Sequence, residues 1–246
     1  MRRQLKAVVV VLAAFALGVP GIRAAEKDAS LLVQYDFDEG AGAVAKDNSG
    51  NGLNGQILKA DYVKHGDGFA LEFKGAGCVL APANAALDAL GKPGKSYTVE
   101  FWFKSPGAEN PSMSEKWPSG SNYPWAIRGP YASDNHIEFA VYDAKNNKAA
   151  GAVVPDPAFK DNAWHHLAAE RDAVKGHLML FIDGVLRGDV VDNLKDVDLS
   201  NAGSVCIGAR SCADAAVSYG FVGQLDGFRV YSRVLSEAEV KAHAGK

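Results

Sequence analysis

Apolar and polar residues alternate along most of the chain after residue 30. In the segment YTVEFWFK, residues 97–104, every second residue from Tyr97 to Phe103 is large and apolar. The segments HIEFAVYD and GQLDGFRVYS repeat this period of two. A period of two places successive side chains on opposite faces of a strand. The pattern therefore predicts several strands, each with one face in a core.

Turn and cap signals divide these segments. The segment HLMLFI runs into Asp183-Gly184, a dipeptide that favours a two-residue hairpin. Near the end of the chain, Ser236 is followed three residues later by Glu239, the spacing of a helix capping box. Many short strands separated by Gly, Pro and Asn predict an all-β antiparallel sandwich with one short C-terminal helix.

A basic and apolar leader opens the chain. Three basic residues within the first six positions precede an unbroken apolar run that ends at Val19. This run is shorter than the roughly 20 residues of a membrane-spanning helix, and the order of the two parts is typical of a secretory signal peptide. We expect residues 1–25 to be a signal peptide, cleaved near residues 24 and 25. An uncleaved anchor is the alternative.

The remaining length suits one large all-β domain or two small ones. The long connection from residue 105 to residue 135 is rich in Pro, Gly and Ser, but its Trp and Tyr residues argue against a flexible linker. We therefore expect a single domain over residues 30–246. The chain has a formal net charge of −3 and no basic stripe, so nucleic acid is not an expected partner. No second long apolar run follows the leader, so no membrane contact is expected after cleavage.

The segment DNSGNGLNG, residues 47–55, is unusually rich in oxygen-bearing side chains and in Gly. It matches the first half of an EF-hand calcium loop, but Leu58 stands where that loop needs an acid, and no helices flank it. Two interpretations stay open. Either the chain makes a tight Asn-Gly turn in which Asp47 bonds its own backbone, or oxygen atoms gather around a cation.

Three segments in this order resemble a known family. They are YDFDEGAGAVAKDNSGNGLNGQI, NAWHHLAAERDAVKGHLMLFIDGVLRG and GFVGQLDGFRVYSRVLSEAEV. Together they resemble the concanavalin A-like lectin/glucanase superfamily, specifically its laminin G-like and pentraxin-like modules. The resemblance covers nearly all of the chain after the leader. It implies a jelly roll of two packed antiparallel sheets.

The resemblance also implies a structural calcium ion. Carried over by position, Asp47 and Asp226 are the expected carboxylate ligands, and Asn51 and Asn54 are expected to add side-chain or backbone oxygens. Calcium prefers six to eight such hard oxygen ligands. Calcium is therefore the expected cofactor, with the bare turn as the alternative.

Catalytic residues are not expected. Glucanases that share the fold use several acids on one strand, in an E-x-D-x-x-E pattern, and glycosidases in general need a pair of carboxyl groups. Here Glu100 and Glu138 each stand alone in a strand pattern. His165 and His166 are consecutive strand residues, so they point to opposite faces and cannot hold one ion together.

A long connection carries the candidate ligand-binding side chains. They are Trp117, Tyr123, Trp125, Arg128 and Tyr131. Aromatic rings can stack on the apolar faces of sugars, and loops above a rigid sandwich are a common place for binding. The alternative is that some rings pack the loop onto the sheet. Packing is favoured for Trp125, because the residues after it indicate the start of a strand.

The three cysteines leave the disulfide pattern open. Cys206 and Cys212 flank a short connection and are a possible disulfide, which would leave Cys78 as a free thiol. Three free thiols are the alternative, since spacing alone does not fix geometry.

These observations together predict a secreted or periplasmic, non-catalytic, lectin-like module that binds glycan and is stabilised by calcium. The chain has no eligible N-x-S/T glycosylation site, which together with the short leader suggests a bacterial exported protein. An extracellular structural or protein-interaction domain is the first alternative. A glycoside hydrolase that uses Glu100 is the second.

Overall fold

The computed structural model describes residues 28–245, apart from residues 110, 119, 133–135, 156 and 213–216. The signal peptide predicted for residues 1–25 therefore lies outside the described residues and stays a prediction. Among the described residues, no helix has the length and the apolar character needed to cross a bilayer.

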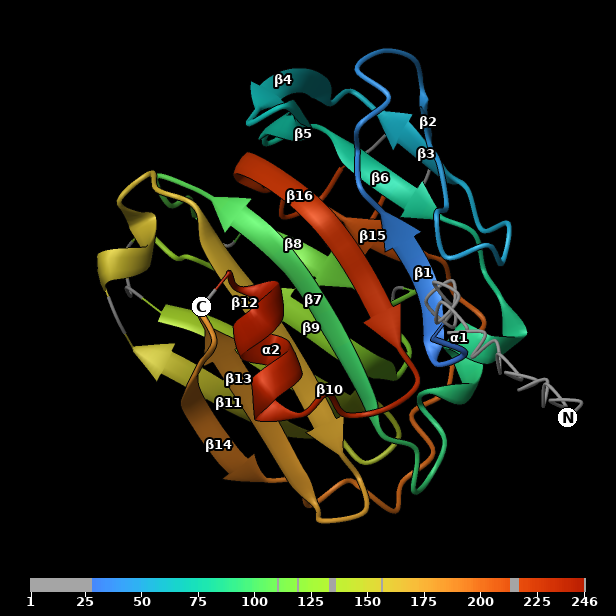
Figure 1. Ribbon diagram of the computed structural model, residues 1–246. Helices are drawn as coiled ribbons and strands as arrows, with labels where there is room; N and C mark the ends of the chain where they lie inside the picture. The colour runs from blue at the N-terminus through green and yellow to red at the C-terminus, as the bar shows by residue number, and fades with distance from the viewer. Residues whose placement is uncertain are drawn as a thin grey trace, which may run out of the picture.

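Two antiparallel sheets pack face to face (Figure 1). Sheet A contains, in spatial order, β14 (Val185–Val191), β13 (His177–Ile182), β12 (His165–Asp172), β7 (Tyr97–Lys104), β16 (Val222–Tyr231), β5 (Gly68–Lys74) and β4 (Asp61–His65), and β1 (Leu31–Tyr35) also pairs with β16. Sheet B contains β11 (Lys148–Pro155), β10 (His136–Asp143), β9 (Tyr123–Arg128), β8 (Ser112–Glu115), β15 (Val205–Ile207), β6 (Cys78–Ala81), β3 (Gly55–Leu58) and β2 (Val44–Ala45). Three short helices complete the described elements: α1 (Ala85–Ala89), the 3-10 helix η1 (Pro157–Lys160) and α2 (Glu237–His243). The predicted all-β jelly-roll sandwich is confirmed.

The core lies between the two sheets and is formed by the strand faces that the alternation of apolar and polar residues predicts to be buried. On β7, the alternating residues from Tyr97 to Phe103 are buried in the core. On β10, Ile137 and Phe139 face them from sheet B. The hairpin after β13 is also confirmed, because Asp183 and Gly184 both have positive φ, as a type I′ turn requires.

The C-terminal helix covers part of the outer face of sheet A (Figure 1). Ser236 and Glu239 form the predicted capping box. Val240 on α2 and Leu235 before it pack against Ala168 of β12, in a small apolar cluster separate from the main core. The helix therefore buries part of the outer face of sheet A.

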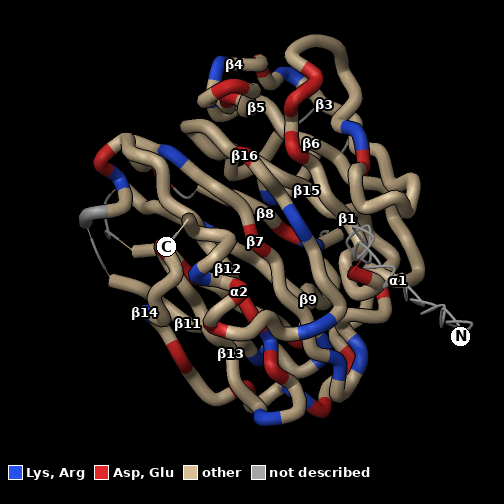
Figure 2. The backbone as a smooth tube through the Cα atoms, in the orientation of Figure 1, with Lys and Arg blue, Asp and Glu red and all other residues tan. Residues whose placement is uncertain are grey.

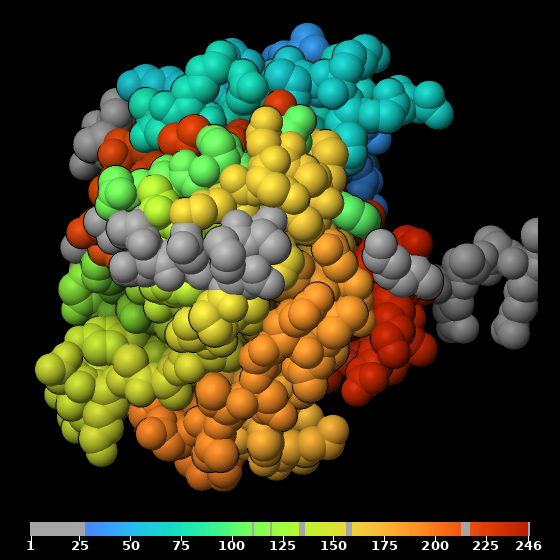
Figure 3. All heavy atoms as spheres, turned by 90° about the vertical axis from the view of Figure 1, so that its left-hand side faces the viewer, coloured from blue at the N-terminus to red at the C-terminus, as the bar shows by residue number. Residues whose placement is uncertain are grey.

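The edge strands β14 and β11 lie next to each other on one side of the sandwich (Figure 3). At Gly188 of β14, an added Cβ would meet Ala152 and Val153 of β11 at about van der Waals distance. A small residue is therefore what lets the two edges approach there. Lys, Arg, Asp and Glu are interspersed along the part of the chain that the structure describes (Figure 2).

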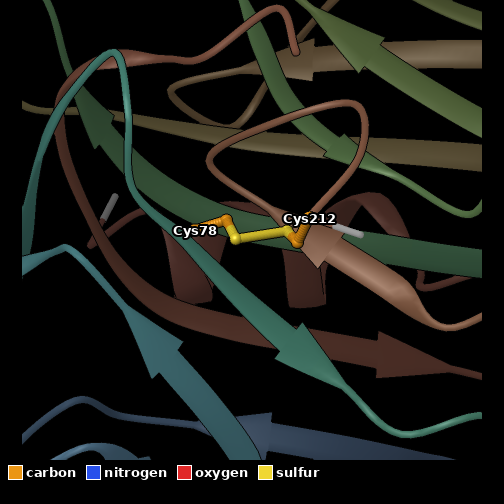
Figure 4. The surroundings of a disulfide bond; sticks show 2 residues. All are labelled: Cys78 and Cys212. Carbon is orange, nitrogen blue, oxygen red and sulfur yellow. A yellow bond between two sulfur atoms is a disulfide. The ribbon is translucent and has the colours of Figure 1, made fainter. Parts of the chain in front are cut away.

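The cysteine pairing differs from the prediction. Cys78 forms a disulfide with Cys212 (Figure 4). Cys206 is a free, buried thiol. The predicted Cys206–Cys212 pair is therefore wrong. The reason is strand pairing: β6 and β15 are neighbours, so Cys78 and Cys206 share the outer face of sheet B, and Cys212 folds back onto that face. Proximity in the chain did not decide which thiols pair.

Candidate functional site on the outer face of sheet B

A β-bulge in β9 decides which aromatic side chains face outward. Tyr123 pairs with Tyr142 and Ala126 with Ala140, so β9 holds one residue more than β10 between these pairs. The extra residue changes the alternation within β9. Tyr123 therefore lies on the outer face, while Trp125 turns inward.

Trp125 belongs to the core and not to a binding surface. Its side chain is fully buried, its ring packs against Tyr97, and its indole N–H donates to Ser114 Oγ at 3.2 Å. Trp125 as a ligand-binding residue is therefore wrong, and the packing alternative is correct for this residue. An unbroken strand would have kept it on the same face as Tyr123.

Arg128 is the centre of a charged network on the outer face. Its guanidinium donates to both carboxylate oxygens of Glu115, at 2.8 and 3.2 Å, and to Glu138 at 3.0 Å. The Tyr131 hydroxyl donates to the same Glu138 oxygen at 3.3 Å. Such a two-point contact between guanidinium and carboxylate fixes the geometry of both groups. The network therefore presents rigid donors and acceptors at the surface.

Burial and charge act in opposite directions on Arg128. Burial acts to lower the pKa of its guanidinium, but the hydrogen bonds that it donates to Glu115 outweigh burial and raise that pKa above its ordinary value. Burial raises the pKa of the Tyr123 hydroxyl. Arg128 is therefore a permanent cation and Tyr123 a neutral phenol at physiological pH.

Aromatic rings form a continuous layer beside this network. Tyr123 stacks on Tyr142, with 5.1 Å between ring centroids, and meets Trp117 edge to face at 6.1 Å. The Arg128 guanidinium lies 5.4 Å from the Tyr123 ring centroid. The rings close over Ala126 and Ala140, whose small side chains leave room for them. Trp117 and Tyr142 remain partly exposed.

Arg210 and a small pocket extend the site toward β15. Arg210 Nε donates to Glu115 at 3.3 Å, and its guanidinium lies over the rings of Trp117 and Tyr219. A pocket of about 210 Å³ opens next to Trp117, with Ser204 and Cys206 among its lining residues. We call the whole group the outer-face cluster: Glu115, Trp117, Tyr123, Arg128, Tyr131, Glu138, Tyr142, Arg210 and Tyr219.

The structure thus brings four of the five predicted ligand-binding residues onto one face: Trp117, Tyr123, Arg128 and Tyr131. Sequence reasoning missed the other members. Glu138 was recognised only as an isolated acid, and Arg210 and Tyr219 lie far from the predicted loop in the chain. The alternation of HIEFAVYD places Glu138 on the face opposite Ile137 and Phe139. No pattern in a single sequence shows which residues of other strands lie beside Glu138 on that face.

The predicted calcium ligands do not form one site. The Asp47 carboxylate accepts the backbone N–H groups of Gln34, Ser49 and Leu53, at 3.1, 2.9 and 2.9 Å. Each N–H turns its positive end toward the place a cation would take. The Ser49 contact is the local turn of the alternative interpretation, in which Asp47 bonds its own backbone. The Asn54 side-chain oxygen accepts the Asp47 N–H at 2.9 Å, so it is also engaged.

The other two predicted ligands are held elsewhere. Asn51 donates its amide N–H groups to the carbonyls of Leu31 and Leu32. Asp226 lies on β16, where its carboxylate contacts His65 Nδ1 at 2.6 Å and accepts the Gly227 N–H. Among the residues that the structure describes, no three His, Cys, Asp or Glu side chains gather in a metal-binding arrangement. The four residues do not fit a shared calcium ion as placed, and calcium itself stays a prediction from the resemblance.

Glu100, the acid considered for catalysis, is fully buried on the side of sheet A that α2 covers. Its carboxylate lies 3.5 Å from His166 and 3.0 Å from His243 of α2. Burial acts to raise the pKa of Glu100, but these two histidines outweigh it and hold it at about 2. His165 contacts Phe103 and Asp183 instead, so the two consecutive histidines do point to opposite faces. A polymer cannot reach Glu100 in this position.

Comparison with known families agrees with the observed fold. Residues 77–241 match a laminin G family model described as the concanavalin A-like lectin/glucanases superfamily. The chain belongs to this superfamily. The resemblance seen in the sequence is thereby confirmed. Pentraxin-related protein PTX3 of Mus musculus is 26% identical over 156 residues, which are 61% of this chain and 39% of that protein. PTX3 of Bos taurus is 25% identical over the same shares. The chain thus spans about two fifths of the length of these curated relatives.

Solved structures of the same fold include two binding modules from larger proteins. Domain 4 of AbnA, an extracellular GH43 arabinanase from Geobacillus stearothermophilus, superposes with a TM-score of 0.65 at 19% identity, over 87% of this chain and 98% of that one. The binding domain of Paraclostridial Mosquitocidal Protein 1 superposes with a TM-score of 0.67 at 15% identity, over 87% and 52%. At these identities, the similarity between this chain and the two structures is one of fold.

Proposed function

We propose that this protein is an exported, non-catalytic carbohydrate-binding module, and that the outer-face cluster is its glycan-binding surface. The observation that carries the proposal is the combination of partly exposed aromatic rings with fixed charges on one face. Trp117 and Tyr142 offer ring surface to the C–H face of a sugar. Arg128 and Glu138 offer a donor and an acceptor for hydroxyl groups beside them.

Rigidity supports the proposal. The Arg128 guanidinium is fixed by three hydrogen bonds, and the aromatic rings are fixed by packing on one another. Preformed sites lose less conformational freedom when a ligand binds, so a shallow surface of this kind can still hold a sugar. Five members of the cluster lie on strands, which favours a defined ligand orientation: Glu115, Tyr123, Arg128, Glu138 and Tyr142.

The comparisons with known structures support carbohydrate binding by analogy of fold. Domain 4 of AbnA was solved in complex with arabinotriose. A botulinum neurotoxin type C structure of the same fold, with a TM-score of 0.67, comes from a toxin that interacts with two ganglioside molecules. Arabinotriose and gangliosides both contain sugars, so a sugar is the ligand class that we infer for this chain. The burial of Glu100 supports a binding role over catalysis by that residue.

The test is retention on a panel of insoluble and gel-embedded polysaccharides, using the wild-type chain and two tryptophan variants. We expect Trp117→Ala to weaken retention about tenfold, which is about 1.4 kcal/mol of binding free energy. Trp164→Ala is the matched control, because Trp164 is also partly exposed but stacks on His65 of sheet A. Equal loss in both variants, or no retention of the wild type on any polysaccharide, would overturn the proposal. Capture by a protein alone would favour the interaction-domain alternative.

A further inference from the structure

Arg210 and Tyr219 sit on two arms of one loop, residues 208–212 and 217–221. Arg210 N–H donates to the Ser218 carbonyl at 3.1 Å, and Phe221 N–H donates to the Gly208 carbonyl at 2.8 Å. The Tyr219 carbonyl accepts the Ser112 N–H at 2.9 Å, which ties the second arm to β8. The Cys78–Cys212 disulfide ties the first arm to β6. The arms are thus fixed on the sheet at several points.

Tyr219 has a backbone conformation that its packing does not explain. Its φ is +54°, in the left-handed region that bulky residues rarely occupy, and its side chain is 44% exposed. The ring belongs to none of the apolar clusters of the described residues. Its close contact is the Arg210 guanidinium, 3.6 Å from the ring centroid. Strain that is retained without burial points to a functional position for the ring.

The Arg210 guanidinium lies over two aromatic rings, and its side chain is partly exposed. Trp117 lies on it with 5.0 Å from ring centroid to guanidinium carbon, and Tyr219 lies at 3.6 Å. Nε reaches Glu115, while Nη1 and Nη2 have no hydrogen-bond or ion-pair partner among the described residues. The pocket of about 210 Å³ beside Trp117 is smaller than the range of about 300–1,000 Å³ for drug-sized ligands, and it suits a single sugar ring.

Charge decides the class of sugar. Arg128 and Arg210 carry two positive charges, and Glu115 and Glu138 carry two negative charges, so the network has no net charge. A sugar carboxylate at Arg210 would also lie near the Glu115 carboxylate, which repels it. The chain as a whole is acidic, at −3. Neutral hydroxyl groups are repelled neither by the Glu115 carboxylate nor by the net negative charge of the chain.

We propose that Arg210, clamped by its contacts with the rings of Trp117 and Tyr219, donates its Nη hydrogens to adjacent hydroxyls of a neutral sugar unit seated at the pocket. The site thereby selects uncharged glycans over acidic ones. This inference rests on the proposed function and adds the ligand class and the residues that determine it. Tyr219 supplies one stacking face, and its strained backbone keeps that face in place.

The first experiment compares neutral and acidic polymers by affinity electrophoresis. The probes are soluble arabinan, xylan and mixed-linkage β-glucan against polygalacturonate and alginate. We expect binding to at least one neutral polymer, with less than about a twofold change in affinity between about 50 and 500 mM NaCl, since a neutral ligand brings no charge to screen. Binding to the acidic polymers alone, with affinity that falls steeply with salt, would overturn the inference but leave glycan binding intact.

The second experiment separates the clamp from the rest of the surface. Tyr219→Asn keeps a residue that tolerates positive φ but removes the ring, so we expect an unchanged or higher melting temperature and about tenfold weaker binding. Tyr219→Phe should bind as the wild type does. Arg210→Lys keeps the charge but not the planar donor edge and should bind about tenfold more weakly, while Arg187→Lys on β14 is the control. Wild-type affinity in both Tyr219→Asn and Arg210→Lys would refute the clamp alone, whereas no binding to any polymer would refute the proposed function as well.

Discussion

At the scale of single residues, Asp47 organises the glycine-rich turn through hydrogen bonds to the backbone. Its buried carboxylate accepts three backbone N–H groups. Burial acts to raise the pKa of Asp47. The three backbone hydrogen bonds and one from the Ser49 side chain outweigh burial and lower the pKa below its usual value. A group with a lowered pKa stabilises the fold above its unfolded pKa, and this stabilisation is lost as pH falls through the folded pKa.

We predict that Asp47→Asn lowers the free energy of unfolding by about 1–3 kcal/mol, because an amide cannot accept all three bonds. Denaturant titration at neutral pH measures this loss. Asp67→Asn, at an exposed position, should change little. The loss should be the same with excess calcium and with chelator. A loss seen only with calcium present would instead establish the ion that the family resemblance implies.

Glu170 is a second residue whose environment sets a pH response. It is buried on β12, where it accepts hydrogen bonds from Thr98 Oγ1 and the Leu235 N–H. Burial raises its pKa to about 7, above the ordinary value of 4.5. A raised carboxyl pKa means that the group stays protonated up to a higher pH in the folded state than in the unfolded state. Its contribution to stability is therefore complete below about pH 4.5 and is lost as pH rises to about 7.

We predict that Glu170→Gln is more stable than the wild type at pH 8, by up to roughly 3 kcal/mol, since one pKa unit corresponds to about 1.4 kcal/mol. Gln keeps an oxygen that can accept the same two hydrogen bonds. Unfolding measured from pH 4 to pH 8 should show the difference growing with pH. A constant difference across this range would contradict the assignment.

At the scale of elements, the Cys78–Cys212 disulfide joins β6 to the first arm of the Arg210 loop. The two cysteines are 134 residues apart, so the bond closes a long loop in the unfolded chain. Cys206 lies in the same small cluster, and burial raises the pKa of its thiol to about 11. An un-ionised thiol is a poor nucleophile, so Cys206 should react slowly at neutral pH.

We predict that Cys212→Ser lowers the free energy of unfolding by about 2–5 kcal/mol and weakens glycan binding, because Arg210 loses its anchor. Cys206→Ala should cost less and leave binding unchanged. Thiol titration in denaturant without reductant should find one reactive thiol per wild-type chain. Three reactive thiols would show that the bond does not form in the isolated protein.

Elements also show why local patterns gave only part of the site. The alternation of β7 and β10 and the capping box before α2 are local properties, and each was predictable from a few adjacent residues. The residues after Trp125 indicate a strand and favour packing, but the bulge that turns Trp125 inward depends on how β9 and β10 pair. The same holds for the disulfide, which follows from the pairing of β6 with β15.

At the scale of the whole molecule, the two outer faces differ. Sheet A carries α2 over buried polar residues such as Glu100, while sheet B carries the partly exposed outer-face cluster. The family could be identified from the ordered motifs, and with it the sandwich. The meeting of Arg210 with Arg128 and Glu115 could not, because residues from distant parts of the chain meet only through the sheet topology. The function proposed here depends on that meeting.

The most direct test of the binding surface uses the four tryptophans as reporters. Trp117 lies in the outer-face cluster and Trp125 in the core. Trp102 lies on sheet A, and Trp164 stacks on His65 of that sheet. The measurement is the set of indole ¹H–¹⁵N signals during titration with oligosaccharides of the retained polysaccharide. The account predicts that the Trp117 signal shifts in step with binding while those of Trp102 and Trp164 stay in place. Saturable shifts of Trp102 or Trp164 with an unmoved Trp117 would place the ligand on sheet A and contradict the account.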